Sequence, residues 1–252
     1  VNPRAGNETT LIISPTRFKQ TVAVVGGGVA GLSAAMTAAE RGLKVTLFEK
    51  RASLGGQFDM AMRIPGKEEF VNTLKFYETE LTRLAVKINL ETDVTAEELK
   101  AFDHVIIATG VNPRIPELEG MGLPNVVTYA QIIRGEHTAG ENVVILGAGG
   151  IGFDTAEFLT QKGPSHALDK EVFKNSWGVV DDMTVPGNIT KPKLEPSPRQ
   201  VTMFQRKASK AGAGLGLSTG WIHRAEIQRR GVNTIVGVTY EKITAEGLHY
   251  RI

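Results

Sequence analysis

The chain has no cysteine among its 252 residues. That absence excludes disulfides, thiolate metal sites, iron–sulfur ligation by this chain and a redox-active dithiol, and it therefore excludes a disulfide reductase. The net charge is only +2, which gives no general field for binding nucleic acid. An apolar content of 41% and a charged content of 22% are typical of a soluble globular protein, and the length allows two domains.

Long apolar runs are scarce as well. Residues 21–39 carry no charge and are nearly long enough to cross a bilayer, but their glycines and their strand–turn–helix pattern explain the run better. We therefore expect no membrane segment, no signal peptide and a cytoplasmic protein. Val1 stands where a start methionine would, so we expect the natural protein to begin earlier.

The first strong pattern lies between Thr21 and Glu49 and predicts a strand, a tight turn, a helix and a second strand. Gly26, Gly28 and Gly31 stand in G-x-G-x-x-G register where the helix must begin. In a dinucleotide fold the first glycine permits the turn, the second lets a pyrophosphate approach, and the third lets the helix pack closely on the strand. The free N–H groups of the helix then face the phosphates.

Glu49 ends the second strand, about twenty residues beyond the glycines, where a carboxylate accepts hydrogen bonds from a ribose 2′-OH. A 2′-phosphate would be repelled there, so this site suits FAD or NAD rather than NADP. The alternative is an ordinary glycine-rich turn in an α/β domain.

Two further segments are candidates for the same site. Gly56 and Gln57 belong to a second glycine-rich loop, which either wraps the cofactor or is only a loop. Thr109 and Gly110 follow the strand 104–108, which is apolar enough to be buried on both faces, and ligands lie at the carboxyl ends of such strands.

The remaining pattern sets the domain organisation. Residues 1–20 form an extended lead-in, an amphipathic core helix is predicted over 67–85, and prolines 113, 116 and 124 mark a boundary. We expect a first nucleotide domain over 21–125 and a second over 126–252.

The second domain repeats the first motif. Gly147, Gly149 and Gly152 follow the strand 142–146 in G-x-G-x-x-G register, and two such folds in one chain are far more specific than one. Residues 164–198 hold five of the eleven prolines and no helical period, so we expect a surface insertion there, with Trp177 as its anchor.

A change of charge distinguishes the second fold. Gln205, Arg206 and Lys207 end its second strand, where the first fold has Glu49. The loss of an acid and the gain of two cations is what a 2′-phosphate requires, so this site should prefer NADPH. A solvated basic edge is the alternative.

Two nucleotide folds, one ending in an acid and one in a basic pair, look like the paired FAD and NAD(P) domains of flavoprotein reductases. More specific motifs are VNPRA at 1–5, IPGKEEF at 64–70, GAGGIGFDTA at 147–156, SPRQ at 197–200, QRKASK at 205–210 and TGWIHR at 219–224. From end to end the chain resembles the bacterial NADPH-dependent 2,4-dienoyl-CoA reductases. Trimethylamine and histamine dehydrogenases share this architecture.

The resemblance implies an α/β fold of two Rossmann-like domains of the flavoprotein disulfide-reductase type. That reductase family also has an FMN-binding (β/α)8 barrel, which takes the dienoyl-CoA, and a [4Fe–4S] cluster. Neither is carried by this chain, which we expect to begin after the cluster cysteines and to end before the closing segment of the FAD domain.

By this resemblance NADPH passes a hydride to FAD, and the enzyme reduces unsaturated fatty acyl-CoA in β-oxidation. The cofactors carry the chemistry, so we expect no catalytic side chain and no metal ligand in this chain, and the histidines should be structural. Two alternatives are a module of an amine dehydrogenase whose second fold binds no nicotinamide, and a structural remnant without cofactor.

Overall fold

The computed structural model describes residues 4–252, so the first three residues of the VNPRA motif lie outside it. The chain forms two units. Unit 1 comprises residues 1–61 and 69–112, and unit 2 comprises residues 62–68 and 113–252. Each unit is built around its own parallel sheet.

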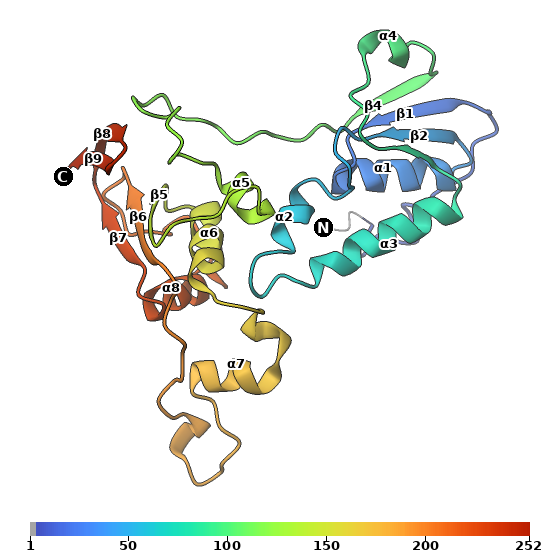
Figure 1. Ribbon diagram of the computed structural model, residues 1–252. Helices are drawn as coiled ribbons and strands as arrows, with labels where there is room; N and C mark the ends of the chain where they lie inside the picture. Colours follow the sequence, from blue (N-terminus) through green and yellow to red (C-terminus); the bar gives the residue numbers. More distant parts are fainter. Residues whose placement is uncertain (1–3) are drawn as a thin grey trace. The chain divides into compact units, whose positions relative to one another are not determined.

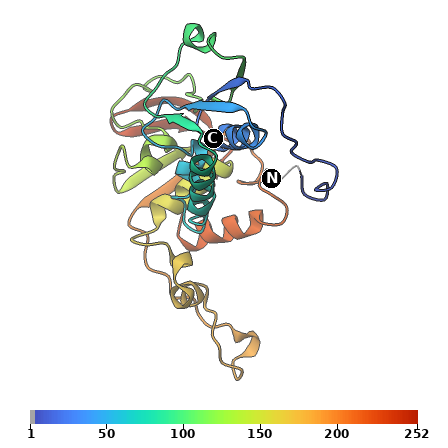
Figure 2. The same cartoon turned by 90° about the vertical axis from the view of Figure 1, so that its right-hand side faces the viewer.

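Unit 1 has a four-stranded parallel sheet in the order β3-β2-β1-β4. Its elements are β1 (Thr21–Val25), α1 (Val29–Glu40), β2 (Lys44–Phe48), α2 (Gln57–Ala61), α3 (Phe70–Arg83), β3 (Lys87–Asn89), α4 (Ala96–Leu99) and β4 (His104–Ile107). Helix α1 packs on β1 and β2, and α3 packs on α1 (Figure 1 and Figure 2). Leu32 of α1 and Leu47 of β2 are fully buried, and the burial of such apolar side chains stabilises the packing of the helix on the sheet.

Two expectations for unit 1 need correction. Strand β4 is not buried on both faces, since Val105 is 41% and Ile107 is 65% exposed. Among residues 4–252 it is an edge strand that pairs with β1 alone, and it therefore lacks the second neighbour that a central strand has. The helix predicted over 67–85 begins at Phe70, because Lys67 N–H donates to the carbonyl of Ile64 and forms a turn before the helix.

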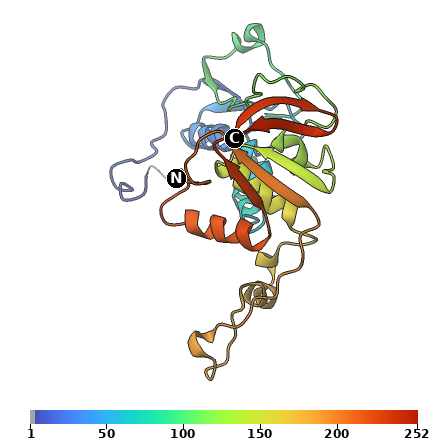
Figure 3. The same ribbon diagram turned by 90° about the vertical axis from the view of Figure 1, so that its left-hand side faces the viewer.

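Unit 2 repeats the strand–turn–helix plan in a three-stranded parallel sheet, β5-β6-β7 (Figure 3). Its elements are α5 (Tyr129–Arg134), β5 (Asn142–Leu146), α6 (Gly150–Thr160), η1 (His166–Leu168), α7 (Lys170–Trp177), η2 (Pro186–Asn188), β6 (Gln200–Gln205), α8 (Gly220–Arg229), β7 (Asn233–Val236), β8 (Thr239–Thr244) and β9 (Gly247–Arg251). The buried Phe153, Met203 and Ile227 join α6, β6 and α8 in one core. Strands β8 and β9 form an antiparallel hairpin.

The domain boundary lies earlier than expected. Residues 113–125 belong to unit 2, because they pack on the β8–β9 hairpin. Ile243 N–H donates to the carbonyl of Glu119 at 2.8 Å, and Asn125 Nδ2 donates to the carbonyl of Thr244 at 3.0 Å. Prolines mark where regular structure ends, but they do not show which unit the irregular segment packs against.

The insertion at 164–198 extends from unit 2, as Figure 2 and Figure 3 show. It contains a helix that the sequence pattern did not predict, α7, which is capped by Asp169 Oδ1 and ended by Gly178 in the left-handed conformation. Eight residues give too few turns for an apolar period to stand out.

The α/β fold with two Rossmann-like halves is confirmed. Within residues 4–252, none of the helices has both the length and the apolar character that a bilayer crossing requires.

Gly152→Ala should destabilise unit 2, because the new Cβ would lie 2.1 Å from the carbonyl oxygen of Gly147. We expect a loss of about 1–3 kcal/mol in the free energy of unfolding, measured with urea. Gly140→Ala is the matched control, since no described residue lies within 4 Å of its new Cβ. Equal losses in both variants would contradict the close-approach argument.

Candidate functional site

The glycine turn of unit 1 brings the helix very close to the strand. Gly26 has φ of +109°, and a Cβ there would lie 2.3 Å from the carbonyl oxygen of Ala108 at the end of β4. A Cβ on Gly31 would lie 1.9 Å from the carbonyl oxygen of Gly26. Gly28 is the N-cap of α1 and has no side-chain cap, so the first N–H groups of the helix point out of the turn. All three positions therefore have the geometry that the motif predicted.

Glu49 lies directly beside this turn and is only 6% exposed. Its Oε2 accepts from Gly27 N–H at 2.6 Å, and its Oε1 accepts from Arg51 N–H at 2.8 Å. A carboxylate oxygen has a further lone pair for a ribose hydroxyl, so these bonds orient the group without exhausting it. Gly27, which the motif reading passed over, supplies the first of these donors.

The second glycine-rich loop meets the first turn. Gly55 N–H donates to the carbonyl of Gly27 at 2.8 Å, and a Cβ on Gly56 would lie 3.0 Å from the Cα of Gly28. Gln57 is the first residue of α2 rather than part of a loop, and its Nε2 lies 3.4 Å from the carbonyl oxygen of Val111.

Thr109 and Gly110 follow β4 on the same edge of the sheet. The N–H of Ala108 donates to the carbonyl of Val25, so the two residues leave the sheet beside the first turn, and Gly110 has φ of +72°. The expected residues of the first site therefore gather at the carboxyl edge of the sheet of unit 1.

Unit 2 reproduces the turn. Gly147 has φ of +115°, and Gly149 is the N-cap of α6 with no side-chain cap, as Gly28 is for α1. Gly152, discussed above, makes the close approach that Gly31 makes in unit 1.

A cavity of about 620 Å³ opens at this turn. The cavity is lined by the expected residues Gly147, Gly149, Arg206 and Lys207. Strand β8 and the segment before the sheet of unit 2 complete the lining. The other charged or hydroxyl-bearing residues that line it are Arg114, Glu117, Ser209, Thr239 and Tyr240. Three cations therefore face one acid, and the volume lies within the range of small-molecule sites. Gly152 lies behind the cavity and has a packing role.

Two of the lining glycines have no structural reason to be glycine. Neither Gly149 nor Gly214 has a positive φ, so the backbone does not require glycine at these positions. Among the described residues, nothing lies within 4 Å of a Cβ built on either glycine. Side chains there would extend into open space beside the helix N-terminus, where a pyrophosphate would pass. This open space and the nearby cations fit a dinucleotide with an extra phosphate.

Tyr240 closes one side of the cavity. Its hydroxyl donates to the carbonyl of Phe204 at 3.0 Å, and burial raises its pKa while the nearby Arg206 lowers it. Tyr240 therefore keeps its proton near pH 7 and contributes an uncharged side chain to the lining of the cavity.

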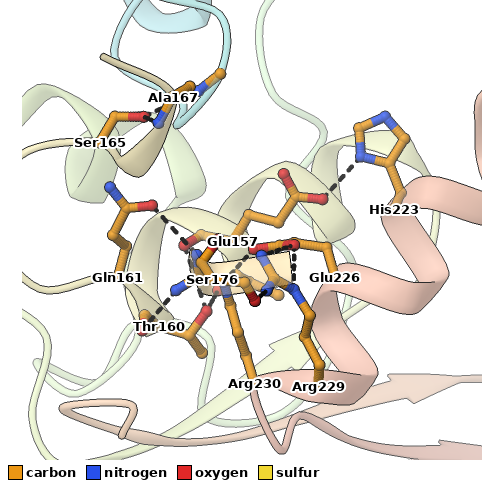
Figure 4. A network of polar contacts seen from close by, with 12 residues as sticks. Glu157, Thr160, Gln161, Ser165, Ala167, Ser176, His223, Glu226, Arg229 and Arg230 are labelled. Carbon is orange, nitrogen blue, oxygen red and sulfur yellow. Dashed lines mark hydrogen bonds and ion pairs between the residues drawn. The ribbon is translucent and has the colours of Figure 1, made fainter. Parts of the chain in front are cut away.

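A polar network attaches the insertion to α6 and α8 (Figure 4). The guanidinium of Arg229 lies 4.0 Å above the ring of Trp177 and also donates to the carbonyl of Ser176. Arg230 contacts Glu226 at 2.5 Å and the carbonyl of Thr160 at 3.4 Å. Trp177 is thus an anchor of the insertion, as the sequence suggested.

The network also contains an acid–histidine group that sequence reasoning missed. His223 Nδ1 lies 2.7 Å from Oε1 of the buried Glu157, and Asp154 lies near both. Lys67 Nζ, 2.6 Å from Asp154 Oδ1, already balances one of these acids. Glu157 and His223 are 66 residues apart, so no local spacing could have revealed the pair.

Comparison with known sequences identifies the family. The pattern of the pyridine nucleotide-disulphide oxidoreductases matches residues 20–251. This chain belongs to that family. Because it has no cysteine, it is a family member without a dithiol of its own.

Two related sequences illustrate the range of the family. The metal reductase of Desulforamulus reducens is 30% identical over 257 residues, which cover 98% of this chain and 37% of the relative. The NADH oxidase of Thermoanaerobacter brockii is 38% identical over 170 residues, which cover 65% of this chain and 26% of the relative. The chain thus spans well under half the length of either relative.

Two solved structures are similar to this chain over nearly its whole length. A 2-naphthoyl-CoA reductase in complex with 2-naphthoyl-CoA is 26% identical with a TM-score of 0.79, over 99% of this chain and 33% of that one. Histamine dehydrogenase from Rhizobium sp. 4-9 is 19% identical with a TM-score of 0.68, over 96% of this chain and 34% of that one. The latter similarity shows the fold alone.

Glu157→Gln should change how stability depends on pH. Burial raises the pKa of Glu157 above its ordinary 4.5, although His223 partly opposes this. The group's stability contribution is therefore present below the unfolded pKa and is lost as the pH rises through the folded pKa. As the pH rises from the unfolded to the folded pKa, the free energy of unfolding of the glutamine variant should increase relative to that of the wild type, by on the order of 1 kcal/mol. Urea unfolding between about pH 4 and pH 8 measures this difference, and a difference that stays constant with pH would contradict it.

Proposed function

We propose that this chain is the FAD- and NADPH-binding, electron-input part of a cytoplasmic NADPH-dependent reductase of the 2,4-dienoyl-CoA reductase type. One observation carries the proposal: Arg206 and Lys207 line the same cavity as Gly147 and Gly149. Two cations and a helix N-terminus thus meet in one cavity, which is the arrangement that a coenzyme with a 2′-phosphate needs.

In the first site, the turn formed by Gly26, Gly28 and Gly31 would hold the pyrophosphate of FAD. Glu49 would accept the ribose hydroxyls, since its carboxylate is already oriented by the N–H groups of Gly27 and Arg51. Gly56, Gln57, Thr109 and Gly110 would line the path of the flavin half.

In the second site, Gly147 and Gly149 would hold the pyrophosphate of NADPH, while Arg206 and Lys207 would bind its 2′-phosphate. The bound coenzymes supply hydride transfer from nicotinamide to flavin. The chain's own residues bind and orient the two coenzymes, and none of them needs to move a proton.

The acyl-CoA substrate would bind outside this chain. Because the relatives are about three times as long as this chain, the FMN barrel and the [4Fe–4S] cluster that the resemblance implies would belong to the longer enzyme. The similarity to 2-naphthoyl-CoA reductase supports a substrate with a conjugated acyl-CoA group, as in the reduction of unsaturated fatty acyl-CoA.

A second candidate is a module of an amine dehydrogenase, in which the second fold binds an adenine nucleotide or nothing. Anaerobic mixing of the full-length enzyme with NADPH distinguishes the two. Bleaching of the flavin absorbance supports the proposed reductase. A flavin that stays oxidised with NADPH and NADH alike contradicts it and supports the amine dehydrogenase type. A full-length enzyme purified without any flavin absorbance would favour the structural remnant.

Arg206→Ala should weaken NADPH binding by about ten- to a hundredfold, because one charge-assisted hydrogen bond is worth about 1.5–3 kcal/mol. NADH affinity should change little, since NADH lacks the 2′-phosphate. Isothermal titration of the purified chain with each coenzyme measures both constants.

The matched control for Arg206→Ala is Lys210→Ala. Lys210 is an exposed cation of the same loop, but it is not among the described residues that line the cavity. It should leave both affinities within about twofold because exposed charges are screened. Equal losses of NADPH and NADH affinity in Arg206→Ala would show that Arg206 does not read the 2′-phosphate.

A further inference from the structure

The strand registers of the two units identify which residue of unit 2 corresponds to Glu49. Val25 pairs with Phe48 in unit 1, and Leu146 pairs with Phe204 in unit 2. The hydrogen bonds agree, since Gly26 N–H donates to the carbonyl of Phe48 at 2.8 Å and Gly147 N–H donates to that of Phe204 at 2.9 Å. The next residue along each strand is Glu49 in one unit and Gln205 in the other. An amide therefore stands where the first unit has its carboxylate.

Both side chains form a hydrogen bond with the backbone two residues further along the chain, but Glu49 accepts this bond and Gln205 donates it. Glu49 Oε1 accepts from the N–H of Arg51 at 2.8 Å. Gln205 Nε2 donates to the carbonyl oxygens of Lys207 at 2.9 Å and Ser209 at 2.7 Å. Because both partners of Gln205 are acceptors, only a side-chain donor holds this loop, and an ionised carboxylate has none.

The loop that Gln205 holds carries the cations of the cavity. The carbonyl of Lys207 also accepts from Gly237 N–H at 3.2 Å, so the turn is fixed from two sides. Gln205 itself lines the cavity, and Arg206, Lys207 and Ser209 line it from this turn. The orientation of the two cations toward the cavity therefore depends on hydrogen bonds made by a residue whose own charge is zero.

We infer that Gln205 is a positioning residue that sets coenzyme selectivity, acting through the loop that presents Arg206 and Lys207. Gln205 would contribute in two ways. Its side chain is uncharged, so it does not repel a 2′-phosphate as a carboxylate would. Its amide group also holds the loop whose cations would bind that phosphate. This inference rests on the proposed NADPH site and adds a residue to it.

Two substitutions separate the two contributions. Gln205→Met keeps the size but loses the donor, so NADPH affinity should fall about tenfold, the usual worth of a lost hydrogen bond or two, while NADH affinity stays nearly unchanged. Gln205→Glu also adds the carboxylate of unit 1, so NADPH affinity should fall at least about a hundredfold and the preference should shift to NADH. Adenosine 2′,5′-bisphosphate and AMP, titrated as probes without nicotinamide, should show the same pattern.

A double substitution tests whether Gln205 acts through its loop. In an Arg206→Ala background, Gln205→Met should cost less NADPH affinity than it costs in the wild type, because one of the two cations that it positions is gone. Gln200→Met, at the opposite end of the same strand, is the control and should leave both affinities unchanged.

The outcomes distinguish this inference from the proposed function. If the wild-type chain shows no preference for NADPH, or binds neither coenzyme, the proposed site fails and this inference fails with it. If the wild type prefers NADPH but Gln205→Met and Gln205→Glu keep that preference, or lower both affinities equally, only the role of Gln205 is overturned. Should Gln205→Glu fail to fold, Gln205→Met and the double substitution still decide the question.

Discussion

The structure depends on how closely each helix approaches the strand before it. In both units the third glycine of the motif lies against the carbonyl of the first, at a separation that a Cβ cannot occupy. This contact places the unpaired N–H groups of the helix at the carboxyl edge of the sheet, next to the end of the neighbouring strand. In unit 1 the side chain that follows this strand, Glu49, contacts the turn itself through the N–H of Gly27.

The two units apply this arrangement with opposite charge. In unit 1 the strand ends in a buried carboxylate oriented by backbone donors, and in unit 2 it ends in an amide followed by two cations that line a cavity. On the proposed function, the first site would take a bare ribose and the second a phosphorylated ribose. One motif used twice, with different side chains at the strand end, is a sufficient physical account of how one chain would bind two coenzymes.

Local patterns predicted the fold well. The strand Asn142–Leu146 has its predicted bounds, and the two glycine motifs begin their helices where the spacing required. Two wrong predictions have physical causes. Strand β4 was predicted to be buried because apolar content alone does not show that a strand lies at the edge of a sheet. Helix α7 was not predicted because eight residues are too few to show a helical repeat of apolar side chains.

The candidate site was predicted only in part. The charges at 49, 206 and 207 follow from motif spacing, but the role of Gly27 as a donor to Glu49 requires coordinates. The same holds for the pairing of Glu157 with His223, which depends on how two distant helices pack, and for the hydrogen bonds of Gln205, which depend on the shape of one loop. The most direct test of the account is a crystal structure of this chain with FAD and NADPH. The account predicts the 2′-phosphate of NADPH within about 3 Å of Arg206 or Lys207 and a ribose hydroxyl of FAD on Glu49. A 2′-phosphate directed into solvent, away from both cations, would contradict it.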